Sequence, residues 1–289
     1  MPAWVGGGHI QGYADDTMHF VTANCAKEVV HQLEQGAREI LSYFASNELV
    51  ANPSKTAFLL FRPAGAGGTN VDVSVGGTII RESVSERILG IQVQNSLKWD
   101  DHIKKVITKV NYGLSTIRQL QGVIRKKALK AIAEGMVMSH LRYGISVYLS
   151  GDLRLSSGDP VSDNLNKLQV KQNDAMRLVL NKRRKDLTPR ETLLKQFETK
   201  SINQMASEAV VMELWRAYHF GVDAISQSYN TEMSARRRHL LRTSKDPRSF
   251  ISKSATLWNQ MSDNFRTQKL TVWSAKREAA QKAITLPAF

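Results

Sequence analysis

The sequence predicts an α+β fold whose character changes near residue 95. Before that point, short apolar runs alternate with turn signals, as in HIQGYADDTMHFVT and VDVSVGGTII, and one long amphipathic helix separates them. After it, apolar residues recur at helical spacing through several long segments. We therefore expect a helix packed on small sheets over residues 1–95 and a mainly α-helical chain over residues 96–289.

Hairpins, strands and one helix are expected in the first part. The segments HIQGYA and TMHFVT should form a β-hairpin with Asp15 and Asp16 at its turn. An amphipathic helix should follow over residues 26–49 and stop at Asn52-Pro53. The remaining β elements are expected as a buried strand over 56–61, a hairpin over 71–81 and a strand over 88–93.

Long helices should dominate the rest of the chain. Apolar spacing predicts helices over residues 103–120, 126–140 and 163–180, the first of them capped by Asp100 or Asp101. Two capping-box patterns, which begin at Thr188 and Ser201, predict two further helix starts.

Two turn-rich segments are candidate linkers. Residues 151–160, GDLRLSSGDP, are the better candidate, and residues 226–234 are the weaker one. Together with the change of pattern near residue 95, they suggest three domains, over residues 1–95, 96–150 and 151–289.

Composition and missing motifs exclude several classes of protein. Cys25 is the single cysteine, which excludes a disulfide framework and a zinc site built on cysteine pairs, and we interpret it as a buried packing residue. The seven histidines form no HExxH-type pair, and the glycines form no dinucleotide or P-loop motif. No uninterrupted apolar stretch approaches the length of a membrane-spanning helix, which is about 18 residues. We therefore expect an intracellular protein, nuclear or cytoplasmic, without a membrane partner.

Positive charge is concentrated in the helical part. The net charge is +14, and residues 1–99 hold 7 Lys and Arg against 9 Asp and Glu, whereas the remainder holds 33 against 17. Such an excess favours a nucleic-acid partner contacted through its phosphates. The candidate contacts are Lys104, Lys105, Lys109, Arg125, Lys126, Lys127, Lys182, Arg183, Arg184, Lys185, Arg236, Arg237, Arg238 and Arg242. The alternative is a set of solvated helix faces, with Trp215, Trp258 and Trp273 in the core.

Tyr13-Ala14-Asp15-Asp16 is the sharpest chemical signal. Paired carboxylates at the tip of a braced hairpin are suited to hold Mg²⁺ for phosphoryl transfer. Adjacent strand residues point to opposite faces, so a further carboxylate from another strand is required. The alternative is a solvated Asp-Asp turn.

Lys55 is the second candidate. It lies in Asn52-Pro53-Ser54-Lys55-Thr56, one helix after the hairpin, where it could protonate or neutralise a pyrophosphate leaving group. The alternative is a solvated lysine in a turn that ends a helix.

The order of these motifs resembles a known family. The motifs that carry this resemblance are, in order, the YADD hairpin, the helix that follows it, NPSKT, Leu89-Gly90-Ile91, and LKWDDHI over 97–103. Through them the chain resembles the later palm and thumb of reverse transcriptases of non-LTR, LINE- or jockey-like, retrotransposons. Similar features continue in LRYG over 141–144, LQVKQ over 168–172, Thr188-Pro189 before Leu193-Leu194, and LWN over 257–259. The match is strong over residues 8–150 and thinner beyond them.

The resemblance implies roles for several residues. Asp15 and Asp16 would bind two Mg²⁺ ions together with a further carboxylate, Lys55 would lie beside the incoming nucleotide, and Tyr13 would lie near the primer end. Residues 89–91 would belong to the primer grip. Residues 1–95 would form a partial palm, residues 96–150 a helical thumb and residues 151–289 a basic helical region. The partners would be RNA and DNA as primer and template, and deoxynucleotides.

The sequence also departs from the family. Only 12 residues precede the YADD box, and none of them is acidic, whereas the family's other metal carboxylate and its fingers lie upstream of this box. We therefore expect an RNA-directed DNA polymerase that cannot polymerise alone and binds Mg²⁺ weakly or not at all. The alternative is a non-catalytic, nucleic-acid-binding relic of a transposable element. The oligomeric state stays open.

Overall fold

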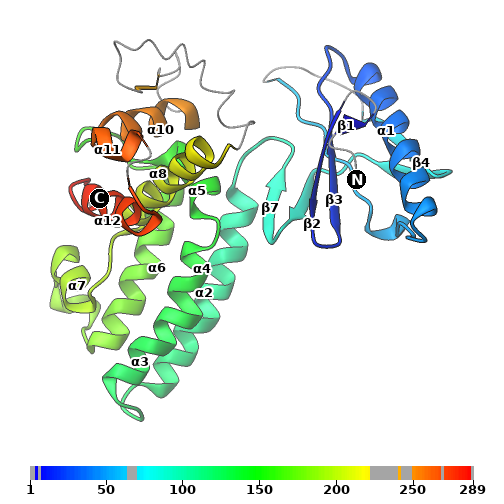
Figure 1. Cartoon of the computed structure of the whole chain (residues 1–289). Coiled ribbons are helices and arrows are strands. Elements are labelled where there is room, and N and C mark those ends of the chain that lie inside the picture. The colour runs from blue at the N-terminus through cyan, green and yellow to red at the C-terminus, as the bar shows by residue number, and fades with distance from the viewer. Residues whose placement is uncertain are drawn as a thin grey trace. The chain divides into compact units, whose positions relative to one another are not determined.

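A computed structural model describes residues 4–5, 8–63, 70–221, 240–241, 249–267 and 270–287 (Figure 1). Contacts within the chain group it into two compact units, Met1–Asp101 and His102–Phe289, and each is described by itself. The first is built from small antiparallel sheets and one long helix, and the second is α-helical, which agrees with the expected α+β class. The division into three domains stays a prediction.

The first unit opens with a three-stranded antiparallel sheet and a helix. Strands β1 (Trp4–Val5), β2 (Gly8–Tyr13) and β3 (Asp16–Phe20) lie in sequence order, and β2 pairs with β3 as the predicted hairpin. Helix α1 (Ala26–Ser46) follows and confirms the predicted helix, although it ends three residues before the expected end at 49.

Close packing holds α1 against one face of this sheet. Ile10 is buried, and its partner across the hairpin, His19, lies on the same face. A methyl group at Gly36 of α1 would overlap the imidazole ring of His19, because the helix backbone approaches β3 this closely. Gly36 is therefore required for contact between helix and sheet, and α1 covers this face (Figure 1).

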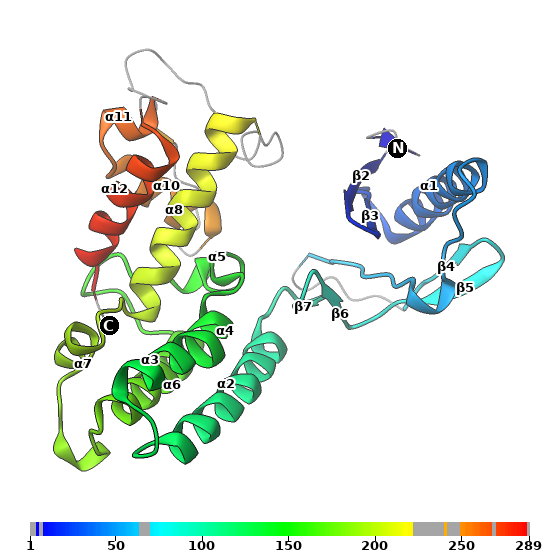
Figure 2. The ribbon, with the colours of Figure 1, turned by 60° about the horizontal axis from the view of Figure 1, so that its bottom comes forward.

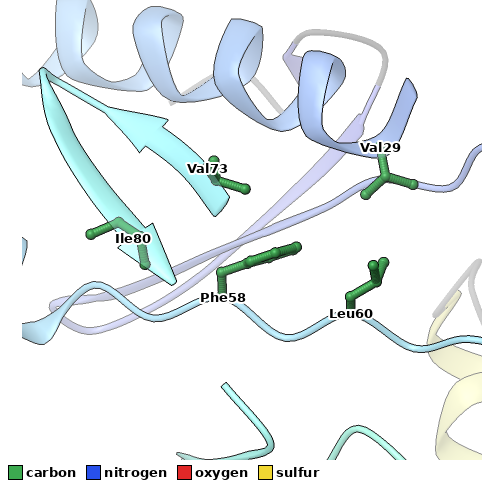
Figure 3. Packing of buried hydrophobic residues seen from close by; sticks show 5 residues of the cluster. All are labelled: Val29, Phe58, Leu60, Val73 and Ile80. Atoms are coloured by element: carbon green, nitrogen blue, oxygen red, sulfur yellow. The ribbon is translucent and has the colours of Figure 1, made fainter. Parts of the chain in front are cut away.

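The core of the first unit lies between α1 and a second hairpin. Strands β4 (Asp72–Val75) and β5 (Thr78–Arg81) pair as predicted around Gly76 and Gly77, whose φ angles are 56° and 82°. Figure 3 shows the side chains of the core, which come from the helix, the hairpin and an extended segment: Val29, Phe58, Leu60, Val73 and Ile80.

The strand predicted over residues 56–61 is wrong as a regular strand. Phe58 and Leu60 are buried and their neighbours are more exposed, so the expected burial holds only for alternate residues of the segment. However, within the described residues the segment forms one isolated bridge, from Phe58 to Glu82, and no ladder with a neighbouring strand. The Arg62 guanidinium forms an ion pair with Glu82 and holds the pKa of that carboxyl below its usual range.

Two other predictions for the first unit need correction. The strand expected over 88–93 is a hairpin of β6 (Ser85–Ile88) and β7 (Ile91–Gln94), turned by Leu89 and Gly90, which both have positive φ. Asn52-Pro53 does not stop α1. The helix ends earlier, where the Asn47 side chain donates to the carbonyl of Tyr43 at 2.8 Å.

Helices form the second unit. The described helices are α2 (Asp100–Leu120), α3 (Lys126–Ala133), α4 (Ser139–Arg142), α5 (Ile145–Tyr148), α6 (Asp163–Leu180), α7 (Arg190–Phe197), α8 (Ile202–Phe220), α10 (Phe250–Asn259), α11 (Asp263–Arg266) and α12 (Val272–Ile284). The helices predicted over residues 103–120 and 163–180 match α2 and α6 closely. A π-helical turn, Glu134–Met138, joins α3 to α4. Helices α2, α3 and α6 run side by side (Figure 2).

One of the two predicted capping boxes is present and the other is not. Ser201 accepts from the backbone N–H of Gln204 and Gln204 reciprocates, so the box that opens α8 is confirmed. The box predicted at Thr188 is wrong, because α7 starts at Arg190, Pro189 takes the capping position, and no side-chain hydrogen bond caps it.

Residues 151–160 are a packed loop and not a linker. The Asn203 side chain accepts from the N–H of Arg154 and donates to its carbonyl, each at 2.9 Å. The Arg154 guanidinium in turn donates to the carbonyls of Ser157 and Asp159. These hydrogen bonds fix the loop inside the second unit. The weaker linker candidate, residues 226–234, lies outside the described residues.

Gly36→Ala should weaken the packing of α1 on the hairpin. Displacing the His19 ring costs about 1–3 kcal/mol of local stability, as overpacking generally does. The measurement is hydrogen exchange of the α1 amides, which should become faster. Gly12→Ala is the matched control, since nothing lies within 4 Å of the methyl group that it adds. Equal exchange rates in the two variants would contradict the packing argument.

Candidate functional site

The hairpin tip brings together three of the predicted site residues. Tyr13 pairs with Asp16 across the hairpin, so Ala14 and Asp15 form a two-residue turn between them. Ala14 has a φ of 54°, a left-handed conformation that costs energy for a residue with a side chain. Tyr13, Asp15 and Asp16 are all exposed. The local fold therefore presents two carboxylates and a phenol at one tip.

The alternation of the strands decides the direction of these side chains. Residues directly opposite each other share a face of a sheet, so Tyr13 and Asp16 share one face and Ile10 and His19 share the other. Because α1 covers the face of Ile10 and His19, Tyr13 and Asp16 project from the face away from the helix. Asp15 projects from the turn itself.

The tip supplies only part of a metal site. Carboxylate oxygens are ligands that Mg²⁺ prefers, and the exposed Asp15 and Asp16 are of the right chemical kind. Within the described residues, however, no group of three or more His, Cys, Asp or Glu side chains could hold a metal ion. Two carboxylates on one turn do not complete a two-ion site.

Lys55 is held in a well-defined turn after α1. The Asn52 side-chain oxygen accepts from the backbone N–H of Ser54 at 3.0 Å and from its hydroxyl at 2.7 Å, which caps the short 3-10 helix Pro53–Lys55. Lys55 itself is exposed. In the described residues, no hydrogen bond or ion pair joins it to Asp15 or Asp16, so the structure does not bring these candidates into contact.

Helix α2 carries the first group of predicted nucleic-acid contacts. Lys104, Lys105 and Lys109 are exposed, while Ile103 and Val106 on the opposite side are buried. Burial lowers the pKa of His102, and the nearby Lys109 and Lys105 lower it further. Burial and Lys109 likewise lower the pKa of His140 on α4. The positive potential of this helix therefore extends to its neighbours.

A second group opens α3 and a third follows α6. Arg125, Lys126 and Lys127 are exposed at the start of α3. The third group, Lys182, Arg183, Arg184 and Lys185, is exposed as well, but it is partly neutralised.

Local carboxylates pair with half of this third group. Arg184 contacts both carboxylate oxygens of Asp174, at 2.9 and 2.8 Å, and Arg183 lies 3.3 Å from Asp186. Sequence reasoning missed the pairing with Asp174 because that residue lies ten positions upstream on α6. Arg236, Arg237, Arg238 and Arg242 lie outside the described residues.

The remaining candidates are settled by burial. Trp215 and Trp258 are core residues, as in the alternative interpretation, whereas Trp273 is 69% exposed. Cys25 is exposed at the start of α1, so its interpretation as a buried packing residue is wrong. Cys25 is the N-cap of α1, and the nearby residues that pack against the core are Val21, Ala23 and Ala26. Among the helices of the described ranges, none is long and apolar enough to cross a membrane.

Comparison with known proteins finds relatives among the proteins of retrotransposons. The chain is similar to RNA-directed DNA polymerases and Pol polyproteins of retrotransposons. It is 24% identical over 170 residues to the probable RNA-directed DNA polymerase from transposon BS of Drosophila melanogaster. These aligned residues cover 58% of this chain and 18% of that protein.

A second relative is the retrovirus-related Pol polyprotein from type-1 retrotransposable element R1 of Nasonia vitripennis. It is 27% identical over 153 residues, which cover 49% of this chain and 44% of that protein. The chain thus spans less than half the length of either relative. No protein-family model and no solved structure matches it.

The pairing pattern predicts unequal contributions of the basic groups to nucleic-acid binding. If each exposed cation contributes one phosphate contact, replacing Arg125, Lys126 and Lys127 at the start of α3 by Gln should flatten the log-log salt slope by about 2–3 units. Replacing Lys182, Arg183, Arg184 and Lys185 should flatten it by only about 2, because two of them already face carboxylates.

Fluorescence anisotropy with a labelled duplex across a salt series measures both slopes. Arg216→Gln is the control, since Arg216 forms an exposed ion pair with Glu213. A larger effect of the quadruple variant than of the triple variant would show that the ion pairs do not reduce phosphate binding.

Proposed function

We propose that this chain is the palm-to-thumb part of a reverse transcriptase of the non-LTR retrotransposon type, followed by a basic region that holds RNA and DNA. The observation that carries the proposal is the exposed Tyr13-Ala14-Asp15-Asp16 tip, on a hairpin braced by α1. Similarity to retrotransposon RNA-directed DNA polymerases supports it. In this proposal residues 1–95 belong to the palm, 96–150 to the thumb and 151–289 to the basic region.

The reaction is RNA-directed DNA synthesis, in which a primer 3′-hydroxyl attacks the α-phosphate of a deoxynucleotide and pyrophosphate leaves. Magnesium, when bound, supplies charge neutralisation on the reacting phosphates. The chain's own contribution is to hold Asp15 and Asp16 on a braced turn and to place Tyr13 beside the primer end. Lys55 acts as the proton donor to pyrophosphate.

A non-catalytic role in nucleic-acid binding is the second candidate. It is favoured by one observation, the lack of a third metal-binding side chain near the tip within the described residues. The exposed cations of α2 and α3 could serve this role without any catalytic centre.

The purified 289-residue chain should show no primer extension with magnesium or manganese. Two carboxylates leave the second ion short of ligands, and loss of one electrostatic element typically costs about 10²–10³ in rate. Incorporation of labelled deoxynucleotides on a primed RNA template is the measurement. Template-dependent synthesis that Asp15→Ala abolishes would prove the site complete as it stands.

An experiment can distinguish the catalytic role from the non-catalytic role in nucleic-acid binding. In this experiment the chain is fused behind the upstream catalytic part of a related retrotransposon polymerase. Asp15→Asn should then abolish synthesis without changing duplex affinity, because it removes a metal ligand and no phosphate contact. Lys55→Ala should lower the rate by about 10²–10⁴, the usual contribution of a general acid, with residual activity from water.

Matched exposed controls are Asp72→Asn on β4 and Lys27→Ala on α1, which should leave the rate unchanged. Complete loss in both the Asp15 and the Lys55 variants would refute the proton-donor role of Lys55. Unchanged activity of Asp15→Asn would refute the proposed function itself.

A further inference from the structure

Helix α12 exposes one side of its surface that the core does not use. Its buried residues, Ala275, Ala279 and Ala283, face the rest of the second unit, where α12 packs against α8 (Figure 2). The opposite side presents an exposed stripe that combines aromatic, basic and apolar side chains: Trp273, Lys276, Arg277, Gln281 and Ile284. We call these five residues the α12 stripe.

An indole ring dominates this stripe and is held in place. Trp273 is 69% exposed, and the guanidinium carbon of Arg277 lies 5.6 Å from its ring centroid, so a cation contacts the ring. The first turn of the helix is fixed by Thr271, whose hydroxyl oxygen accepts from the N–H of Ser274 at 3.2 Å. Trp273 is therefore an open aromatic surface on a rigid helix, with few torsions to immobilise on binding.

The charge of the stripe selects the kind of partner. Lys276 and Arg277 are basic, and the stripe holds no acidic residue. The nearest acidic side chain in the helix, Glu278, is committed elsewhere, because its two oxygens accept from the N–H and the hydroxyl of Ser262, each at 2.8 Å. An anionic partner with flat π surfaces complements this combination.

We propose that Trp273 and Arg277 form a stacking platform for a base of single-stranded nucleic acid, with Lys276 contacting the adjacent phosphate. Aromatic rings stack on any base, and cations follow the backbone, so binding has little sequence preference. The proposal rests on the proposed function only for the class of partner, and it assigns a separate site in the basic helical region.

The test compares strands with and without bases. With the full chain, Trp273→Ala should weaken binding of a labelled 12-nucleotide oligouridylate about 5- to 100-fold, the contribution of one stacked base. Binding of an abasic strand of equal length should not change. Trp273→Phe should keep most of the affinity, and Lys276→Gln should flatten the salt slope by about one unit. Leu187→Ala, which removes a side chain that is 85% exposed, is the control.

Three results would overturn the platform. Equal losses on the oligouridylate and the abasic strand would mean that charge alone acts there. Unchanged affinity of a folded Trp273→Ala protein would refute the site, while duplex binding in the same protein would leave the proposed function standing. A dimer that Trp273→Ala converts to a monomer, with unchanged affinity for the oligouridylate, would make the stripe an interface between copies.

Discussion

The placement of Asp15 and Asp16 depends on the packing of α1 against one face of the β2–β3 hairpin. Two strands and a two-residue turn are marginal in water without a helix or further strands to cover one face. Here the imidazole of His19 fits where Gly36 leaves no side chain, and Ile10 is buried beside it. Because α1 covers the face of Ile10 and His19, and strand residues alternate between the two faces, Tyr13 and Asp16 project from the face away from the helix. The same helix is tied to the second hairpin through Val29 and Val73.

A buried polar network has a comparable role in the second unit. The start of α8 contributes Ser201, Asn203 and Gln204, all of them buried. Gln204 donates to the carbonyls of Ile284 and Leu286, each at 3.2 Å, and Asn203 donates to that of Pro287 at 3.0 Å. Since buried donors must be satisfied, these bonds fix the end of α12 on α8 and so orient the stripe that carries Trp273.

The basic surface is a matter of local pairing as much as of net charge. The run of four cations after α6 is the densest in the described chain, yet Asp174 and Asp186 offset two of its charges. The cations of α2 are fewer, but they lower the pKa of His102 and, through Lys109, that of His140. Counting basic residues along the sequence therefore overstates the positive charge that the run after α6 can offer to phosphates.

The sequence by itself determined the elements whose cause is local. Period-two and helical spacing were enough for the β2–β3 and β4–β5 hairpins, α1, α2 and α6, and the reciprocal hydrogen bonds of Ser201 and Gln204 were visible as a capping box. The position of the YADD motif at the tip was predictable as well, because the two apolar segments on either side of it form a hairpin. Only the tertiary structure decided what depends on distant partners. In the part of the chain that the structure describes, residues 56–61 form no ladder with another strand, residues 151–160 are packed by Asn203, and Cys25 lies outside the core. Trp215 and Trp258 are buried while Trp273 is exposed, because burial is set by which helices meet, and sequence spacing does not encode that.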